Sequence, residues 1–216
     1  MKKSKNISCI LLAGGKGTRF GSFCPKQFLP FRGKPLILHS FDLLQRFPFF
    51  QEIIVVCEDT YHSFFSSSLP LFFASPGERR QDSVWSALQK VSPTSDFVCI
   101  HDGARPFLTL PLLEAVINAG IQYKAATLAV RVTSTIKESS EDLFVKKTHP
   151  RQSLWEIQTP QVISTSLLHK AFLALDSSIE VTDDVSLIER LSLPVKIVES
   201  SPKNMKITHP IDLQLA

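Results

Sequence analysis

Short apolar runs alternate with longer stretches in which apolar residues recur at helical spacing. The run from Ile7 to Leu12, bounded by turn residues, is typical of a strand buried on both faces. Further strands are predicted at Ile53 to Cys57, Phe97 to His101, Ala126 to Val132 and Val195 to Glu199, and helices at 35–47, 112–121, 166–175 and 185–191. This alternation predicts an α/β fold with a twisted, mostly parallel sheet and helices on both faces.

Residues 132–155 break this rhythm. Thr133 to Lys137 and Leu143 to Lys147 are two short β-prone segments, separated by a polar ESSED turn, which predicts a hairpin. A hairpin with so little apolar surface is marginal by itself. We therefore expect a β-arm at about residues 132–152 that packs on something outside itself.

Composition limits the number of domains and the kinds of partner. With 216 residues and 44% hydrophobic content the chain can build one sizeable core, so we expect a single domain over residues 1–216. The formal charge of +4 is small and spread along the chain. It favours phosphate-bearing small molecules over a nucleic-acid partner.

The spacing of the cysteines and the length of the apolar runs indicate the cellular compartment of the protein. Cys9, Cys24, Cys57 and Cys99 form neither a C-x-x-C pair nor a zinc pattern, so we interpret them as reduced structural thiols. The basic start leads into an apolar run too short for a signal peptide, and no run approaches the roughly 20 apolar residues of a membrane span. We expect a cytoplasmic protein with no membrane partner.

A glycine-rich turn follows the first strand at once. Gly14, Gly15 and Gly17 let the backbone approach a ligand closely, so that its N–H groups can point at phosphate oxygens. The sequence GGKGTR has neither the GK[ST] ending of a P-loop nor the GxGxxG spacing of a dinucleotide fold, which disfavours a kinase or a dehydrogenase. Arg19 and Lys26 follow as two cations suited to a phosphoryl group whose charge grows during attack.

Two further segments contain residues of the kinds that can contact a nucleotide. In the turn at 75–83, Gly77 gives backbone access and Arg79 and Arg80 supply cations, while Asp82 or Ser83 can cap the next helix. A capped helix start with surface arginines explains the same residues equally well. The Phe-rich stretch from Phe64 to Phe73 is interpreted as core packing rather than an aromatic clamp.

Asp102 directly follows an apolar strand and is the candidate metal ligand. Mg²⁺ bound to a triphosphate usually takes only one or two protein carboxylates. A helix cap is the alternative role, but Thr109 is better placed to cap the helix that follows. His101 is interpreted as hydrogen-bonded structure, and Asp183 and Asp184 as caps and dipole partners of the helix after them.

The motifs LLAGGKGTR, PKQF, HDGARP, TPQ, TDD and NMKIT occur in that order between Ile7 and Leu213. In this the chain resembles the 2-C-methyl-D-erythritol 4-phosphate cytidylyltransferases, enzymes of the non-mevalonate isoprenoid pathway. The resemblance implies a Rossmann-like sheet, a homodimer embraced by the arm, and transfer of CMP from CTP to a polyol phosphate with Mg²⁺.

The resemblance also implies a role for each matching residue. Catalysis falls to Arg19 and Lys26, and the metal to Asp102. The nucleotide site would comprise Leu12, Ala13, Gly14, Gly15, Gly17, Gly77, Arg80, Ser83, Asp102 and Gly103. The second substrate would meet Arg105, Thr135, Arg151 and Lys206.

One segment departs from the family pattern. Where P-V-x-D-T-I-K is usual, this chain has Arg131 for the proline and Ser134 for the aspartate, while Thr135 is kept. The loss of a charge near the acceptor pocket leaves ribitol 5-phosphate open as an alternative acceptor. A catalytically silent nucleotide-binding regulator of the same fold is a second alternative, although such a protein has no need of cations for both substrates.

Overall fold

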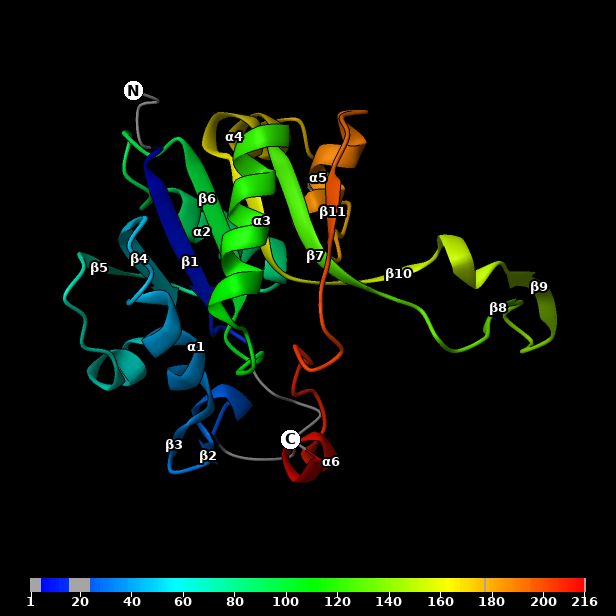
Figure 1. Cartoon of the computed structure of the whole chain (residues 1–216), viewed down its shortest axis with the longest axis horizontal. Coiled ribbons are helices and arrows are strands. Elements are labelled where there is room, and N and C mark those ends of the chain that lie inside the picture. Colours follow the sequence, from blue (N-terminus) through cyan, green and yellow to red (C-terminus); the bar gives the residue numbers. More distant parts are fainter. Residues whose placement is uncertain (1–4, 16–23, 177, 216) are drawn as a thin grey trace.

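The computed structural model describes residues 5–15, 24–176 and 178–215, and a twisted sheet runs through its centre (Figure 1). In this part of the chain seven strands pair in the order β11-β7-β10-β6-β1-β4-β5. They are β1 (Ile7–Leu12), β4 (Phe50–Val56), β5 (Leu71–Ala74), β6 (Phe97–Asp102), β7 (Ala125–Arg131), β10 (Trp155–Ser164) and β11 (Lys196–Glu199). Only β10 runs antiparallel to its neighbours, so the predicted mostly parallel sheet is confirmed.

Helices cover both faces of this sheet, because the residues of each central strand alternate between two cores. Cys9 and Leu11 share one core with α1 (Leu36–Leu44) and α3 (Leu110–Tyr123). Ile10 belongs to the opposite core, with α2 (Arg80–Leu88), α4 (Thr165–Leu173) and α5 (Val185–Arg190). The predicted α/β class is confirmed, and the strands are apolar on both sides because both sides are covered.

Two strands of the sheet, β5 and β10, were not predicted from the sequence. Strand β10 contains the motif TPQ, Thr159 to Gln161. These residues lie inside the strand, where Gln158, Thr159 and Gln161 are buried although polar. Their side chains interrupt the apolar pattern from which strands are predicted. They are buried without penalty because each is hydrogen-bonded to a neighbouring loop or strand.

The Phe-rich stretch contributes to the core as expected, but not along its whole length. Phe65 is buried against α1, and Phe73 packs on the same core from β5. Phe64 and Phe72 are each 43% exposed. The edge strand β5 therefore turns one side of the stretch to solvent.

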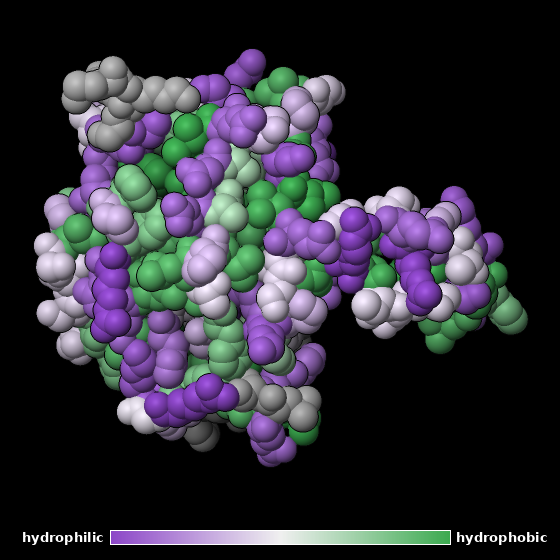
Figure 2. Space-filling view, in the orientation of Figure 1, coloured by the Kyte–Doolittle hydropathy of each residue, from purple (hydrophilic) through white to green (hydrophobic). Residues whose placement is uncertain are grey.

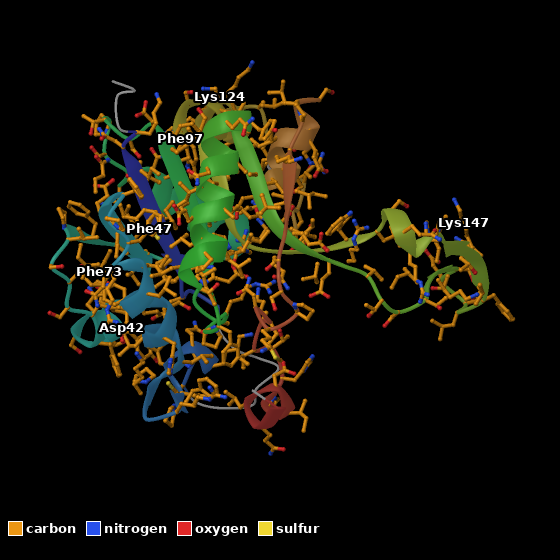
Figure 3. The ribbon with its side chains drawn as sticks, viewed as in Figure 1. Asp42, Phe47, Phe73, Phe97, Lys124 and Lys147 are labelled. Atoms are coloured by element: carbon orange, nitrogen blue, oxygen red, sulfur yellow. The ribbon has the colours of Figure 1, made fainter. Side chains whose placement is uncertain are left out.

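The predicted hairpin is confirmed as an arm that projects from the body of the molecule (Figure 1). Strands β8 (Ile136–Ser139) and β9 (Val145–His149) pair antiparallel with each other, and neither joins the seven-stranded sheet. Figure 3 labels Lys147 on this arm, well away from Phe97 in the sheet. Leu143, Phe144 and Val145 are exposed at its far end, where Figure 2 shows hydrophobic atoms among polar ones.

The C-terminal segment returns to the carboxyl ends of the central strands. The N–H of Ile207 donates to the carbonyl of Ala104 (2.8 Å), and Ile207 packs with Phe31 and Leu36. Phe31 lies in a small hairpin formed by β2 (Pro30–Phe31) and β3 (Lys34–Pro35), and α6 (Pro210–Leu215) ends the chain nearby (Figure 1). Lys206 is thereby brought to the end of β6.

Two further expectations concern cysteines and membranes. None of the four cysteines is in a disulfide. In the described ranges, no helix is both long and apolar enough to cross a lipid bilayer.

Candidate functional site

The first wall of the site is the contact between the glycine turn and the turn that precedes α2. A Cβ placed on Gly14 would lie 2.4 Å from the Cβ of Pro76, so the two turns touch at a distance that only glycine permits. Gly77 lies in the same contact, and its N–H donates to Oγ of Ser83 (3.0 Å). The structure thus brings together Ala13, Gly14, Gly77 and Ser83, which the family resemblance assigns to one nucleotide site.

Gln27 ties the PKQ segment to the glycine turn. Its side-chain amide donates to the carbonyls of Ala13 and Gly15 and is almost fully buried. This places Lys26, the residue before it, in a short 3₁₀ helix beside the turn. Gln27 belongs to the PKQF motif, but the sequence alone did not indicate this role. Gly17 and Arg19 lie outside the described residues.

Lys26 also lies near the C-terminal helix. The pKa of Asp212 in α6 is lowered chiefly by the backbone N–H groups of His209 and Thr208, and in smaller part by the charge of Lys26. The end of the chain therefore lies close to the predicted catalytic lysine.

Asp102, the last residue of β6, is the electrostatic centre of the site. Its Oδ1 accepts hydrogen bonds from Nε and Nη2 of Arg80 (3.3 and 3.2 Å), and its Oδ2 accepts one from Nζ of Lys206 (2.7 Å). Burial raises its pKa, but the charges of Arg80 and Lys206 outweigh burial and hold the pKa well below its usual range. Asp102 is therefore a carboxylate that stays ionised although it is buried.

The backbone around Asp102 is fixed by a chain of buried hydrogen bonds. The N–H of Asp102 donates to Oγ1 of Thr159 (3.0 Å), and this hydroxyl lies 3.1 Å from Nδ1 of His101. Nε2 of His101 lies 3.2 Å from the carbonyl oxygen of Arg105. Burial lowers the pKa of His101 to about 4, so the ring is neutral near pH 7. His101 has the hydrogen-bonded structural role predicted for it.

Arg105 is a buried cation with an unusual set of partners. It is 6% exposed, and its Nη1 and Nη2 donate to the carbonyls of Asn204 (2.9 Å) and Ile157 (3.5 Å). Among the described residues, its Nε has no hydrogen-bond partner. Burial lowers its pKa. A buried guanidinium hydrogen-bonded only to main-chain oxygens retains a strong attraction for an anion.

These groups line one cavity of about 120 Å³ at the carboxyl ends of the parallel strands. Its wall is formed by Arg80, Asp102, Arg105, Ile157, Gln158, Thr159, Gln161, Thr182, Asp183 and Lys206. Gly103 lies at its edge, where its N–H donates to the carbonyl of Leu12 (2.9 Å). Four of the predicted site residues, Arg80, Asp102, Arg105 and Lys206, therefore share this cavity.

The TDD segment requires a correction. Asp183 does cap α5, since its Oδ1 accepts the N–H of Ser186 (3.2 Å). Asp184, predicted as a cap, makes no side-chain cap hydrogen bond and is instead ion-paired with Arg80 (2.8 Å). This role could not be predicted from the sequence because the partner lies 104 residues away along the chain.

The two predicted substrate residues of the arm are not in the cavity. Thr135 and Arg151 are both exposed, and Nη1 of Arg151 donates to the carbonyl of Thr133 (2.8 Å) within the arm. Arg131, which departs from the family pattern, stacks on Trp155 at 4.5 Å and lies 3.5 Å from Glu199. It stabilises the base of the arm, and Ser134 is exposed beyond it.

A family model and two known proteins similar to this chain share one name. A family model described as 2-C-methyl-D-erythritol 4-phosphate cytidylyltransferase matches residues 7–216. The Chlamydia abortus protein of that name is 45% identical over 97% of this chain and 94% of its own length. The chloroplastic protein of the same name from Oryza sativa is 44% identical over 99% of this chain and 74% of its own length.

Solved structures give the same result. The crystal structure of 4-diphosphocytidyl-2C-methyl-D-erythritol synthase from Anaerococcus prevotii matches 99% of this chain and 97% of its own, with a TM-score of 0.85 and 28% identity. The 2-C-methyl-D-erythritol 4-phosphate cytidylyltransferase of Francisella tularensis matches 98% of both chains, with a TM-score of 0.84 and 29% identity.

Proposed function

We propose, since the chain belongs to the 2-C-methyl-D-erythritol 4-phosphate cytidylyltransferase family, that the cavity around Asp102 is where its two substrates meet. The reaction is cytidylyl transfer in isoprenoid precursor biosynthesis. A phosphate oxygen of the polyol attacks the α-phosphorus of CTP, the bond from that phosphorus to the β-phosphate oxygen breaks, and pyrophosphate leaves. The product is 4-diphosphocytidyl-2-C-methyl-D-erythritol.

The nucleotide is assigned to the two touching turns. Ala13, Gly14, Gly77 and Ser83 lie together beyond the end of β1, where backbone N–H groups can meet base and phosphates. Leu12, Gly15 and Gly103 border the same place, and Gly17 belongs to this set by motif alone. Lys26, placed by Gln27, would face the charge that grows on the α-phosphoryl group, together with Arg19.

Asp102 has the position and charge to bind a divalent cation that is carried by the triphosphate. Within the described ranges no three His, Cys, Asp or Glu residues gather closely enough to hold a metal by themselves. One ionised carboxylate beside a phosphate site is nevertheless the usual protein contribution to Mg²⁺. Asp102 would hold Mg²⁺, which when bound supplies charge neutralisation and orientation of the phosphates.

The acceptor phosphate is assigned to Arg105 and Lys206. This assignment rests on a single observation, the buried Arg105 guanidinium that lines the cavity without a hydrogen bond to any described carboxylate. Lys206 lines the same cavity and is ion-paired with Asp102 (2.7 Å). A phosphate dianion would give Arg105 a negatively charged hydrogen-bond partner. Arg105 and Lys206 would then hold the phosphate with two positive charges.

A homodimer would complete the acceptor site. Thr135 and Arg151 lie on a projecting arm whose apolar residues have nothing to pack against within the described chain. If the arm crosses to a second copy, Arg151 can reach the partner's acceptor phosphate. The isologous contact of two such arms is typical of a twofold dimer.

Domain organisation and compartment belong to the same proposal. All three apolar clusters attach to the seven-stranded sheet or its connecting loops, which supports one domain. Thiols outside any disulfide are the usual state in a reducing compartment, which supports the cytoplasm.

A pyrophosphate-release assay tests the reaction. The protein is incubated with Mg²⁺, each of the four nucleoside triphosphates in turn, and methylerythritol phosphate. We expect release with CTP well above that with the other three. Omission of the acceptor and the Asp102→Asn variant serve as controls, and both should abolish most of the signal.

The same assay separates the alternatives. Faster turnover with ribitol 5-phosphate than with methylerythritol phosphate would reassign the acceptor. CTP binding without release of pyrophosphate, with either acceptor, would leave a nucleotide-binding regulator.

A further inference from the structure

Arg80 is held between two buried carboxylates rather than directed into the cavity by itself. Its Nη1 and Nη2 donate to Oδ1 and Oδ2 of Asp184 (2.9 and 2.8 Å), a two-point ion pair. Its Nε and Nη2 both donate to one oxygen of Asp102, Oδ1, at the longer distances of 3.3 and 3.2 Å. The shorter, paired contacts show that Asp184 is the main partner of this guanidinium.

Asp184 is itself held in place by β10. The N–H groups of Asp184 and Val185 donate to Oε1 of Gln161 (2.8 and 3.0 Å), so Gln161 replaces the side-chain cap that α5 lacks. Nε2 of Gln161 donates to Asp183 (3.1 Å). Asp184 is 1% exposed and has little freedom to move away from Arg80.

The consequence falls on the two oxygens of Asp102. Because Arg80 is bound mainly to Asp184, it contacts only Oδ1 of Asp102. Oδ2 of Asp102 accepts the hydrogen bond from Lys206 and can also be reached by ligands in the cavity. We propose that Asp184 is a positioning residue, which holds Arg80 so that one oxygen of Asp102 remains available to the metal-bound nucleotide. This inference rests on the proposed function of the cavity.

Removal of Asp184 should change which atoms Arg80 contacts. An arginine without its preferred carboxylate has Asp102 as its nearest acidic partner and can bind both of its oxygens. Asp102 would then be neutralised by Arg80 on both oxygens. Divalent-cation binding should weaken, although no ligand contact has been removed directly.

The experiment measures cation binding to the full-length protein with CTP, using Mn²⁺ as an electron-paramagnetic probe for Mg²⁺. We expect Asp184→Asn to weaken Mn²⁺ binding about tenfold, the order of a lost charge-assisted contact. The half-saturating Mg²⁺ in the pyrophosphate assay should rise by a similar factor. Asp184→Glu, which restores the charge, should recover most of the affinity.

Asp42→Asn is the matched control, since it removes the charge of a carboxylate that is ion-paired with Lys34 and does not line the cavity. Its Mn²⁺ affinity should stay within about threefold of the original. Equal losses in the two variants would overturn the proposal and leave only a general effect of negative charge. An unchanged affinity in Asp184→Asn would overturn it as well.

Two further measurements keep the outcomes distinct. Glu52→Gln removes a buried carboxylate that accepts from Ser92 (2.7 Å) at the opposite end of the sheet, and should lower the melting temperature without changing Mn²⁺ affinity. If Asp184→Asn does not fold, Gln161→Asn replaces it, because the shorter side chain loses the hydrogen bonds that hold Asp184 beside Arg80 and should weaken Mn²⁺ binding in the same direction. A parent protein that binds no Mn²⁺ with CTP would refute the proposed function instead.

Discussion

The side chains around Asp102 are buried and joined by ion pairs. Those of the arm between β7 and β10 are mostly exposed and, within the described part of the chain, form hydrogen bonds and ion pairs only with other arm residues. The cavity is held in shape by contacts from five parts of the chain, among them α2, β6, β10 and the C-terminal segment. The arm is held by one short hairpin. Both regions carry predicted substrate residues.

This difference teaches how each region can be used. Groups that must stabilise a transition state need fixed positions before the substrates arrive, and a buried network provides them. Groups on an exposed hairpin gain fixed positions only by packing on another surface. Mutations in the cavity should therefore act on chemistry directly, and mutations in the arm should act through assembly.

The largest expected effect is that of Asp102→Asn. The amide keeps the shape of the carboxylate but loses the charge that Arg80, Lys206 and the metal share, so we expect turnover to fall about a thousandfold. The dependence on Mg²⁺ should change at the same time. Turnover at several Mg²⁺ concentrations measures this, and normal activity with an unaltered metal requirement would remove Asp102 from the site.

Lys26→Ala should come next. Its charge should matter most as the transition state forms, so we expect turnover to fall about a hundredfold while CTP binding changes little. Steady-state kinetics with calorimetric measurement of CTP affinity separates the two. Equal losses of CTP binding and turnover would show that Lys26 stabilises bound CTP as much as the transition state. It would then be an ordinary contact residue and not a preorganised catalytic group.

Arg151→Ala tests the arm side of the comparison. We expect the KM for the acceptor to rise about tenfold, the order of a lost charge-assisted hydrogen bond, with little change in CTP binding. The mixing experiment is done with the acceptor well below its KM, where each variant alone has about a tenth of the original activity or less. Mixing this variant with Lys26→Ala under conditions of subunit exchange should then give about a quarter of the original activity, because half of the dimers are mixed and each has one intact site.

The mixing experiment needs proof that subunits exchange, for example by native mass spectrometry of the two variants. An inactive mixture in which mixed dimers have formed would place Arg151 in its own subunit's site, or outside any site. The contrast between a self-contained cavity and a shared arm would then no longer hold.

Phe144→Ser should have the smallest effect. Phe144 is 74% exposed on the arm and touches no core cluster, so the free energy of unfolding of the body should change by less than about 0.5 kcal/mol. Dimer dissociation should increase about tenfold if this ring packs against a partner. Analytical ultracentrifugation over a dilution series measures it, and Lys147→Ser on the same arm is the matched polar control.

Strands β1, β4, β6 and β7 were predictable from sequence because they are buried on both faces and therefore read as unbroken apolar runs. Strand β10 was not, since Gln158, Thr159 and Gln161 are polar residues whose partners lie far along the chain. The hydrophobic pattern of a short segment cannot indicate hydrogen-bond partners that lie elsewhere in the sequence. The same limit hid the pairing of Asp184 with Arg80.

The site shows a similar division. Gly14 and Asp102 could be selected because they directly follow predicted strands, where ligands of parallel sheets bind. The role of Gln27 in anchoring the glycine turn was missed, because a single glutamine has no sequence signature that indicates which backbone carbonyls it will bind. Thr135 and Arg151 were selected by family motif, and their place in a substrate site depends on the proposed dimer.

The path of the chain into and out of the arm has a consequence for evolution. Strands β7 and β10 are antiparallel neighbours, with Arg131 opposite Trp155 at the last pair before the arm. The arm is thus an insertion at the tip of a long hairpin, and its two ends leave the sheet side by side. Its length and sequence can change without altering the register of any strand that carries the site. Interface and acceptor contacts can therefore diverge between relatives while the nucleotide end of the sheet stays the same.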